Sequence, residues 1–130
     1  MKPVLNKPPF CTGYNTYEIK DGIFYIERHV RDHFTIEAFK EITQYSLEYT
    51  EGIAYPVIIF GKDMMSIEKA ARDYMLHEGA QNKLSRAFVV EKKQSKLALQ
   101  FFMQTQKQPI PMEVFEEMAP AIEWSKQFTL

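Results

Sequence analysis

The sequence predicts an α/β fold, in which a mixed sheet with mainly parallel strands is covered by packed helices. Two observations lead to this fold class. Short apolar runs alternate along the chain with segments of helical periodicity, which is typical of parallel strands joined by crossover helices. A hairpin pattern precedes them and adds an antiparallel element. The length of 130 residues, of which 45% are hydrophobic, fits a single domain that spans residues 1–130.

The first sixteen residues, 1–16, are predicted to form an irregular N-terminal lead-in with no more than a short extended piece, because they hold three prolines and Gly13. Cys11 lies in this segment and is the one cysteine of the chain. A single cysteine forms no intrachain disulfide, which favours the reducing cytoplasm as the location.

A β-hairpin is predicted next. Residues 17–20 alternate apolar and polar side chains, Asp21-Gly22 is a favoured two-residue turn, and residues 23–27 resume a β-rich run. The alternation places Phe24 and Ile26 on the opposite face of the second strand from their neighbours.

Helical periodicity begins after Thr35, which can cap the helix, and Gly52 can stop it. Residues 56–60 form a short continuous apolar run, the pattern of a strand that is buried on both faces and central in the sheet. A second helix is expected to begin at Ser66 as its cap and to end near Gly79.

The C-terminal part repeats the alternation. A buried strand is predicted at 87–90, a helix at 95–104, and a strand at 112–115 whose preceding prolines favour an edge position. A last helix begins around Pro120. The predicted order is β-β-α-β-α-β-α-β-α.

Four parts of the chain carry a likeness to a known fold group: the hairpin at 17–27, the strand 57–60 followed by Ala70-Ala71-Arg72, the strand 87–90, and 107–115 with Trp124. In this order they resemble the SpoIIAA-like, or STAS-like, group, and within it the uncharacterised STAS/SEC14-type bacterial domains. The resemblance implies a small α/β domain that acts through partners or ligands, without known catalysis.

The loop after the central strand differs from the pattern of anti-sigma-factor antagonists in this group. Those proteins carry an Asp-Ser dipeptide whose serine is phosphorylated, whereas Asp63 and Ser66 are separated here. Ser66 is therefore expected to cap the helix. A regulatory phosphoserine at Ser66 is the alternative.

A basic block lies within a nearly neutral chain. The formal net charge is -1, but residues 83–107 hold six basic residues against one acidic, a net of +5. Near-neutrality argues against nucleic acid as a partner. Lys92, Lys93 and Lys96, at a strand-to-helix turn, are candidates for binding an anion or an acidic partner, and a solvated surface is the alternative.

The predicted helix around Phe101 and Phe102 is too apolar for one narrow stripe, since adjacent residues on a helix point about 100° apart. We expect both phenylalanines to be buried in the core. The alternative is that one side of this helix forms a homodimer surface or lines a ligand cavity.

The sequence contains few residue patterns that are typical of catalytic sites. His29 and His33 have a spacing that a metal site can use, but no third protein ligand is evident, so solvated loop histidines are expected. No phosphate-binding glycine loop or nucleophile motif occurs, and no cofactor is predicted.

The sequence therefore predicts a cytoplasmic, non-enzymatic regulatory or protein-interaction domain, expected to form a homodimer. The alternative is a domain that binds a small apolar, lipid-like ligand. No segment approaches the ~20 apolar residues of a membrane span, so a protein integral to the membrane is not expected.

Overall fold

The computed structural model describes residues 3–29, 35–61, 68–80 and 82–129. These residues hold six strands in one sheet, in the order β1-β2-β3-β4-β5-β6. The strands are β1 Lys7–Cys11, β2 Asn15–Lys20, β3 Ile23–Arg28, β4 Tyr55–Gly61, β5 Lys83–Val89 and β6 Met112–Phe115. The helices are α1 Ile36–Thr50, α2 Lys69–Leu76, α3 Lys93–Thr105 and α4 Met118–Lys126, with a short 3-10 helix, η1, at Glu78–Ala80.

The sheet is mixed. The strands from β1 to β3 pair antiparallel, and those from β3 to β6 pair parallel. The predicted α/β fold is confirmed, including the central position of β4 and the edge position of β6.

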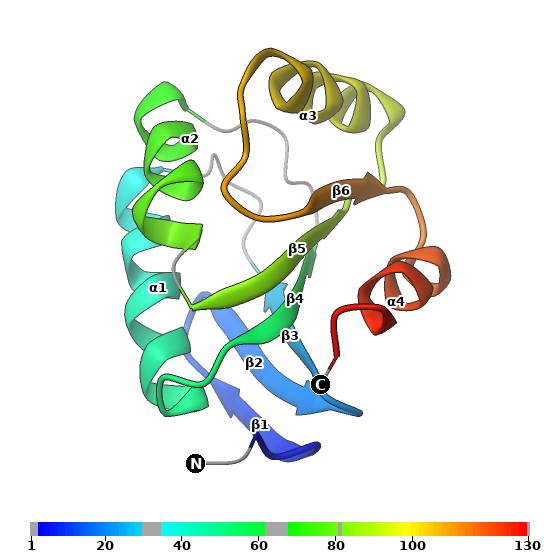
Figure 1. Cartoon of the computed structure of the whole chain (residues 1–130). Helices are drawn as coiled ribbons and strands as arrows, with labels where there is room; N and C mark the ends of the chain where they lie inside the picture. Colours follow the sequence, from blue (N-terminus) through cyan, green and yellow to red (C-terminus); the bar gives the residue numbers. More distant parts are fainter. Residues whose placement is uncertain (1–2, 30–34, 62–67, 81, 130) are drawn as a thin grey trace.

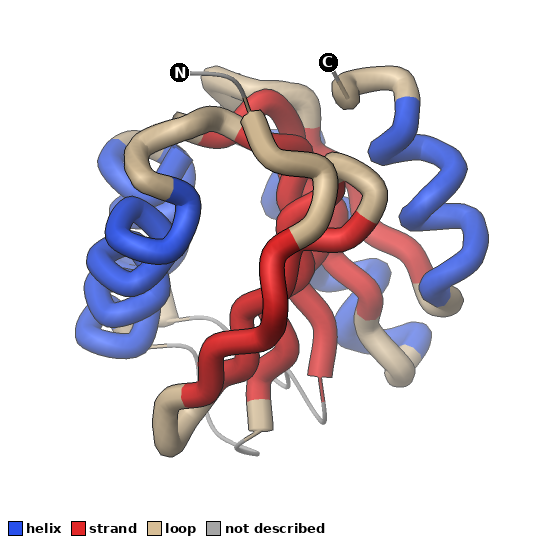
Figure 2. The backbone as a smooth tube through the Cα atoms, turned by 90° about the horizontal axis from the view of Figure 1, so that it is seen from below, coloured by secondary structure: helices blue, strands red, loops and turns tan. Residues whose placement is uncertain are grey.

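Helices cover both faces of the sheet (Figure 1). In the view of Figure 2, turned by 90° from Figure 1, α1 and α2 lie on one side of the strands and α4 lies on the other. Right-handed crossovers explain why α1 and α2 share a side, because each joins neighbouring parallel strands. α3 packs against β6, at one end of the sheet.

Each side of the sheet has its own apolar cluster. The larger cluster lies under α1, α2 and α3 and includes Phe24, Ile59 and Phe88. The smaller one lies under α4 and is built on Ile58 and Ala87. Successive residues of β4 thus enter opposite clusters, as the pleat of a strand buried on both faces requires.

The predicted hairpin is confirmed. Asp21 and Gly22 both have positive φ, 52° and 79°, as a tight turn that follows the strand twist requires. Phe24 and Ile26 pair with Ile19 and Tyr17 and lie in the larger cluster.

The start of α1 also follows the prediction. The Thr35 side chain accepts a hydrogen bond from the Ala38 backbone N–H at 3.2 Å. The helix ends at Thr50, two residues before Gly52, with Glu51 as its C-cap in the left-handed conformation at φ 54°.

The largest differences from the predicted boundaries occur at β1, β5 and α2. The lead-in 1–16 contains the strand β1, whose prolines are tolerated because an edge strand leaves N–H positions on its outer side without partners. β5 begins at Lys83 rather than at residue 87. α2 has Glu68 at its N-cap position, and Ser66, expected there, lies outside the described residues.

Candidate functional site

The predicted site residues of α3 separate into an exposed and a buried set. Phe101 is 68% exposed, whereas Phe102 is 6% exposed and packs in the larger cluster. The expectation that both phenylalanines are core residues is therefore wrong for Phe101. The reason is geometric: α3 packs at the end of the sheet, so only one of two adjacent positions can point inward.

A set of exposed side chains follows one side of α3. Lys93, Leu97 and Phe101 are spaced by four residues, and Leu97 is 55% exposed. A step of four residues rotates the side-chain direction by about 40° around the helix axis. The three side chains therefore share one side of the helix. We call Lys93, Leu97 and Phe101, together with the half-buried Lys96 beside them, the α3 face.

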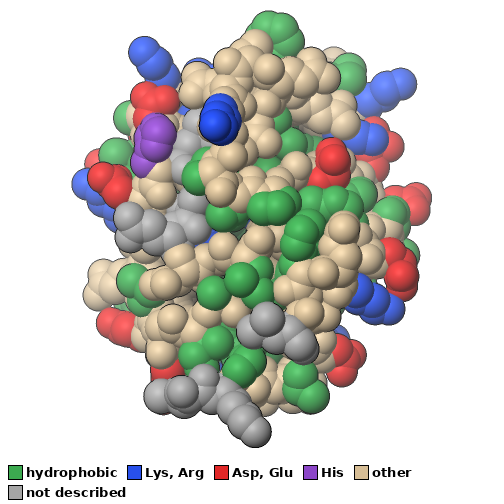
Figure 3. Space-filling view, viewed as in Figure 1, with side chains coloured by type: hydrophobic (Ala, Val, Ile, Leu, Met, Phe, Trp, Pro, Cys, Tyr) green, Lys and Arg blue, Asp and Glu red, His purple; other side chains and the backbone are tan. Residues whose placement is uncertain are grey.

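The electrostatics of the α3 face are basic. No residue of α3 is acidic, and Lys92 and Lys93 lie at its N-terminus, where the backbone dipole is also positive. Figure 3 shows the wider context on one face of the molecule, where charged side chains lie mostly at the margins and hydrophobic ones in the middle. An acidic partner with apolar side chains would complement the α3 face.

The other residues predicted for a site are not brought into it. Asp63 and Ser66 lie outside the described residues, as does His33. His29 is exposed, with its Nε2 2.5 Å from Thr16 Oγ1. Within the described ranges, no group of three or more histidine, cysteine, aspartate or glutamate side chains could hold a metal ion.

A groove that the sequence did not predict runs between β1 and α1. Its volume is about 370 Å³, within the range of small-molecule sites. The lining residues are Lys7, Pro8, Pro9, Phe10, Tyr45, Glu48 and Tyr49. The prolines had marked this segment as irregular, so the wall formed by β1 could not be foreseen.

Hydrogen bonds hold β1 against α1 and so keep the groove in place. The Tyr49 hydroxyl donates toward the backbone oxygens of Pro8, at 2.7 Å, and Lys7, at 2.9 Å. Lys7 Nζ in turn donates to the backbone oxygen of Tyr49 at 2.6 Å. The Phe10 and Tyr45 rings, with centroids 5.7 Å apart, give the groove an aromatic wall.

Two members of the basic block are inside the protein. Lys83 is 9% exposed and Arg86 is 1% exposed, so the block is not a continuous solvated surface. The Arg86 guanidinium donates to the backbone oxygens of Met75, at 2.9 Å, and Gly79, at 2.6 Å. Lys83 Nζ donates to the same Gly79 oxygen at 2.6 Å. Both cations therefore meet the negative, C-terminal end of α2 and η1.

Burial changes the proton affinity of both groups. Burial, together with the neighbouring Arg86 charge, lowers the pKa of Lys83 to about 7. Burial alone lowers the pKa of Arg86 to about 10. A buried positive charge loses its hydration, and the carbonyl oxygens replace only part of it.

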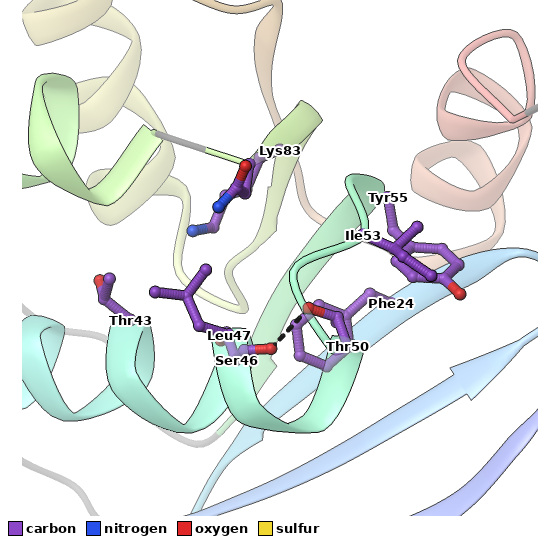
Figure 4. Close-up of a pocket in the computed structure, with 9 residues that line it drawn as sticks. Phe24, Thr43, Ser46, Leu47, Thr50, Ile53, Tyr55 and Lys83 are labelled. Carbon is purple, nitrogen blue, oxygen red and sulfur yellow. Dashed lines mark hydrogen bonds between the residues drawn. The ribbon is translucent and has the colours of Figure 1, made fainter. Parts of the chain in front are cut away.

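Lys83 also lines a small pocket against α1, which we call the Lys83 pocket (Figure 4). Its lining residues are Phe24, Thr43, Ser46, Leu47, Thr50, Ile53, Tyr55, Asn82 and Lys83. The cavity volume is about 10 Å³, enough for one water molecule. The Lys83 side chain points from the start of β5 toward Thr43 and Leu47.

Comparison with known proteins places the chain in a family. Residues 17–129 match the Domain of unknown function (DUF7793). The chain belongs to this family. No curated protein matches it. Thus the DUF7793 match gives membership and no activity.

A solved structure supports the fold of this DUF7793 domain. The crystal structure of an uncharacterised protein from the DUF3478 family, with a SpoIIAA-like fold, from Shewanella loihica PV-4 aligns with a TM-score of 0.52 and 16% sequence identity. The alignment covers 96% of this chain and 98% of that one. The predicted SpoIIAA-like fold is confirmed.

No helix in the described residues is long and apolar enough to cross a membrane.

Proposed function

We propose that this DUF7793 domain is a non-enzymatic regulatory domain that binds a partner protein through the α3 face. The observation that carries the proposal is the exposure of Leu97 and Phe101 side by side on a helix whose only charges are basic. Aromatic and aliphatic side chains exposed together favour protein contact, because their burial removes apolar surface from water. The exposed thiol of Cys11 agrees with a cytoplasmic setting.

The partner chemistry follows from the charge of the surface. We infer an acidic, amphipathic segment whose apolar side chains cover Leu97 and Phe101 while its carboxylates lie near Lys93 and Lys96. Opposite charges at the rim raise the association rate and select against basic partners. A nucleic acid strand fits less well, because the chain as a whole has a net charge of -1.

The test uses two labelled helical peptides with the same leucine pattern, one with glutamates and one with lysines at the polar positions. Fluorescence anisotropy should detect binding of the acidic peptide alone, and binding should weaken as salt is added. The double variant Leu97→Ser/Phe101→Ser should weaken binding by at least about tenfold. The matched control is Leu47→Ser, since Leu47 is an exposed leucine on α1, away from the α3 face.

Three results would count against this proposal. They are equal binding of both peptides, an unchanged affinity in the double variant, and an equal loss in the Leu47 control. Sedimentation equilibrium on the protein alone tests whether a second copy covers the α3 face instead. A dimer that Leu97→Ser/Phe101→Ser dissociates would identify the partner as a second copy and replace the acidic segment.

The groove between β1 and α1 favours a second candidate function, the binding of a small apolar molecule. Its size and its aromatic wall carry this proposal. Native mass spectrometry of the freshly purified protein should then detect a bound apolar compound, and Tyr45→Ala should release it. Protein that is free of ligand, and that takes up no fatty acid or aromatic probe, would contradict this function.

A further inference from the structure

The buried pair Lys83 and Arg86 takes no part in the α3 face or in the groove. In the described part of the chain, the side chains of both cations meet backbone carbonyls and no carboxylate. The positive charge of Arg86 acts on Lys83 and disfavours its protonated form. A buried cation without a counter-ion is energetically unfavourable. The least unfavourable way to remove one charge is loss of a proton from the weaker base of the two, the lysine.

A neutral Lys83 amine would carry a free electron pair. Arg86 keeps the Gly79 oxygen supplied with a hydrogen bond, so a change at Lys83 does not leave that carbonyl without a donor. Burial next to another cation is one of the recognised ways in which proteins turn a lysine into a nucleophile. The lowered pKa of Lys83 agrees with this geometry.

The Lys83 pocket offers a place for a small group attached to this nitrogen. Ser46 lines the pocket and is 6% exposed, and its hydroxyl has no hydrogen-bond partner among the described residues. Leu47 and Asn82 also line the pocket and are exposed, so it opens to solvent between α1 and the start of β5. An acceptor atom on the attached group would satisfy Ser46.

We propose that Lys83 is a modification site that takes a short acyl group, such as acetyl, from an acyl phosphate. The amine nitrogen attacks the acyl carbon, the bond from carbon to the phosphate oxygen breaks, and the bonding pair leaves with the phosphate. The amine proton goes to the released phosphate. The products are an amide on Lys83 and inorganic phosphate, with no oxidant or reductant required.

An acyl group suits this position better than other additions to the nitrogen. The amide is uncharged, so the modification removes the buried positive charge. Its remaining N–H can still donate to the Gly79 oxygen, and its carbonyl oxygen can accept from Ser46. The cavity of about 10 Å³ has room for one water-sized group, so the acyl group must be short and must extend through the opening toward solvent.

The experiment compares acylation of each lysine in the folded protein. The protein is incubated with acetyl phosphate at about pH 7, and the modified peptides are quantified by mass spectrometry over time. At that pH about half of the Lys83 amine is neutral, against about one part in a thousand or less of an ordinary lysine amine. Allowing for restricted access, Lys83 should react at least about tenfold faster than the exposed Lys40 and Lys69.

Two further measurements separate the site from local sequence and from general reactivity. In urea that unfolds the chain, the preference for Lys83 should disappear, because the surroundings that neutralise the amine are lost. In folded Ser46→Ala protein the preference should fall. A rate at Lys83 equal to or below that of Lys40, or a preference that persists in urea, would overturn the proposal.

Discussion

At the scale of single residues, Lys83 and Arg86 show how burial changes the meaning of a charge. In the sequence they belong to a basic block, but in the fold they cap the C-terminal end of α2 and η1. Because α2 has no basic residue in its own last turn, these cations come from a strand that follows it in the chain. The surface charge of the block therefore rests on the lysines around α3.

The lowered pKa of Lys83 predicts a pH dependence of stability. The folded chain releases this proton at about pH 7, whereas an unfolded lysine keeps it to about pH 10.4. The unfolded chain thus binds more protons between these values, so Lys83 makes stability rise with pH across this window. Below about pH 7 the cost of the buried charge is present in full.

Lys83→Met removes this dependence. We consider the free energy of unfolding of the variant minus that of the unaltered protein. This difference should favour the variant most near pH 6, and it should fall by as much as about 4 kcal/mol as the pH rises toward 10. Urea unfolding at several pH values checks this, with the exposed Lys40→Met as control. A difference between Lys83→Met and the unaltered protein that is constant with pH would contradict it.

At the scale of elements, the pairing of β3 with β4 depends on a glycine. Gly61 lies opposite Arg28 in the parallel register and has φ 147°. A Cβ atom added at Gly61 would lie 2.3 Å from the Arg28 backbone oxygen. The two central strands therefore approach each other at a place where only glycine fits.

Gly61→Ala should lower the free energy of unfolding by at least about 2 kcal/mol, because both the backbone strain and the contact with Arg28 are unfavourable. Gly13→Ala is the matched control. A Cβ at Gly13 would meet no atom within 4 Å, and its effect should stay within about 0.5 kcal/mol. Urea unfolding measures both variants, and equal effects would refute the role given to Gly61.

At the scale of the whole molecule, one sheet separates two apolar clusters and carries its candidate sites at different places. The groove lies between β1 and α1, and the α3 face lies near the opposite end of the sheet, beside β6. Binding at one place leaves the other accessible. This separation agrees with the proposal of a regulatory domain that can bind a small ligand and a partner protein at the same time.

Most of the fold could be predicted from the sequence, but little of the candidate site. The hairpin with Asp21-Gly22, the cap Thr35 and the central strand β4 were all predicted, because each depends on neighbouring residues. For β1 the sequence predicts no more than a short extended piece, because prolines in a strand are acceptable only at the edge of a sheet. That location is a property of the assembled sheet.

The site depends on the same distinction. The sequence by itself determined that α3 carries more apolar side chains than one stripe can hold, and that lysines gather around it. Only the tertiary structure decided that Phe101 is exposed while Phe102 is buried. It also decided that Arg86 donates hydrogen bonds to the end of α2 and to η1, and that Lys83 donates to η1, from inside the protein. Periodicity records which residues share a side of an element, whereas burial depends on elements that meet only after the chain has folded.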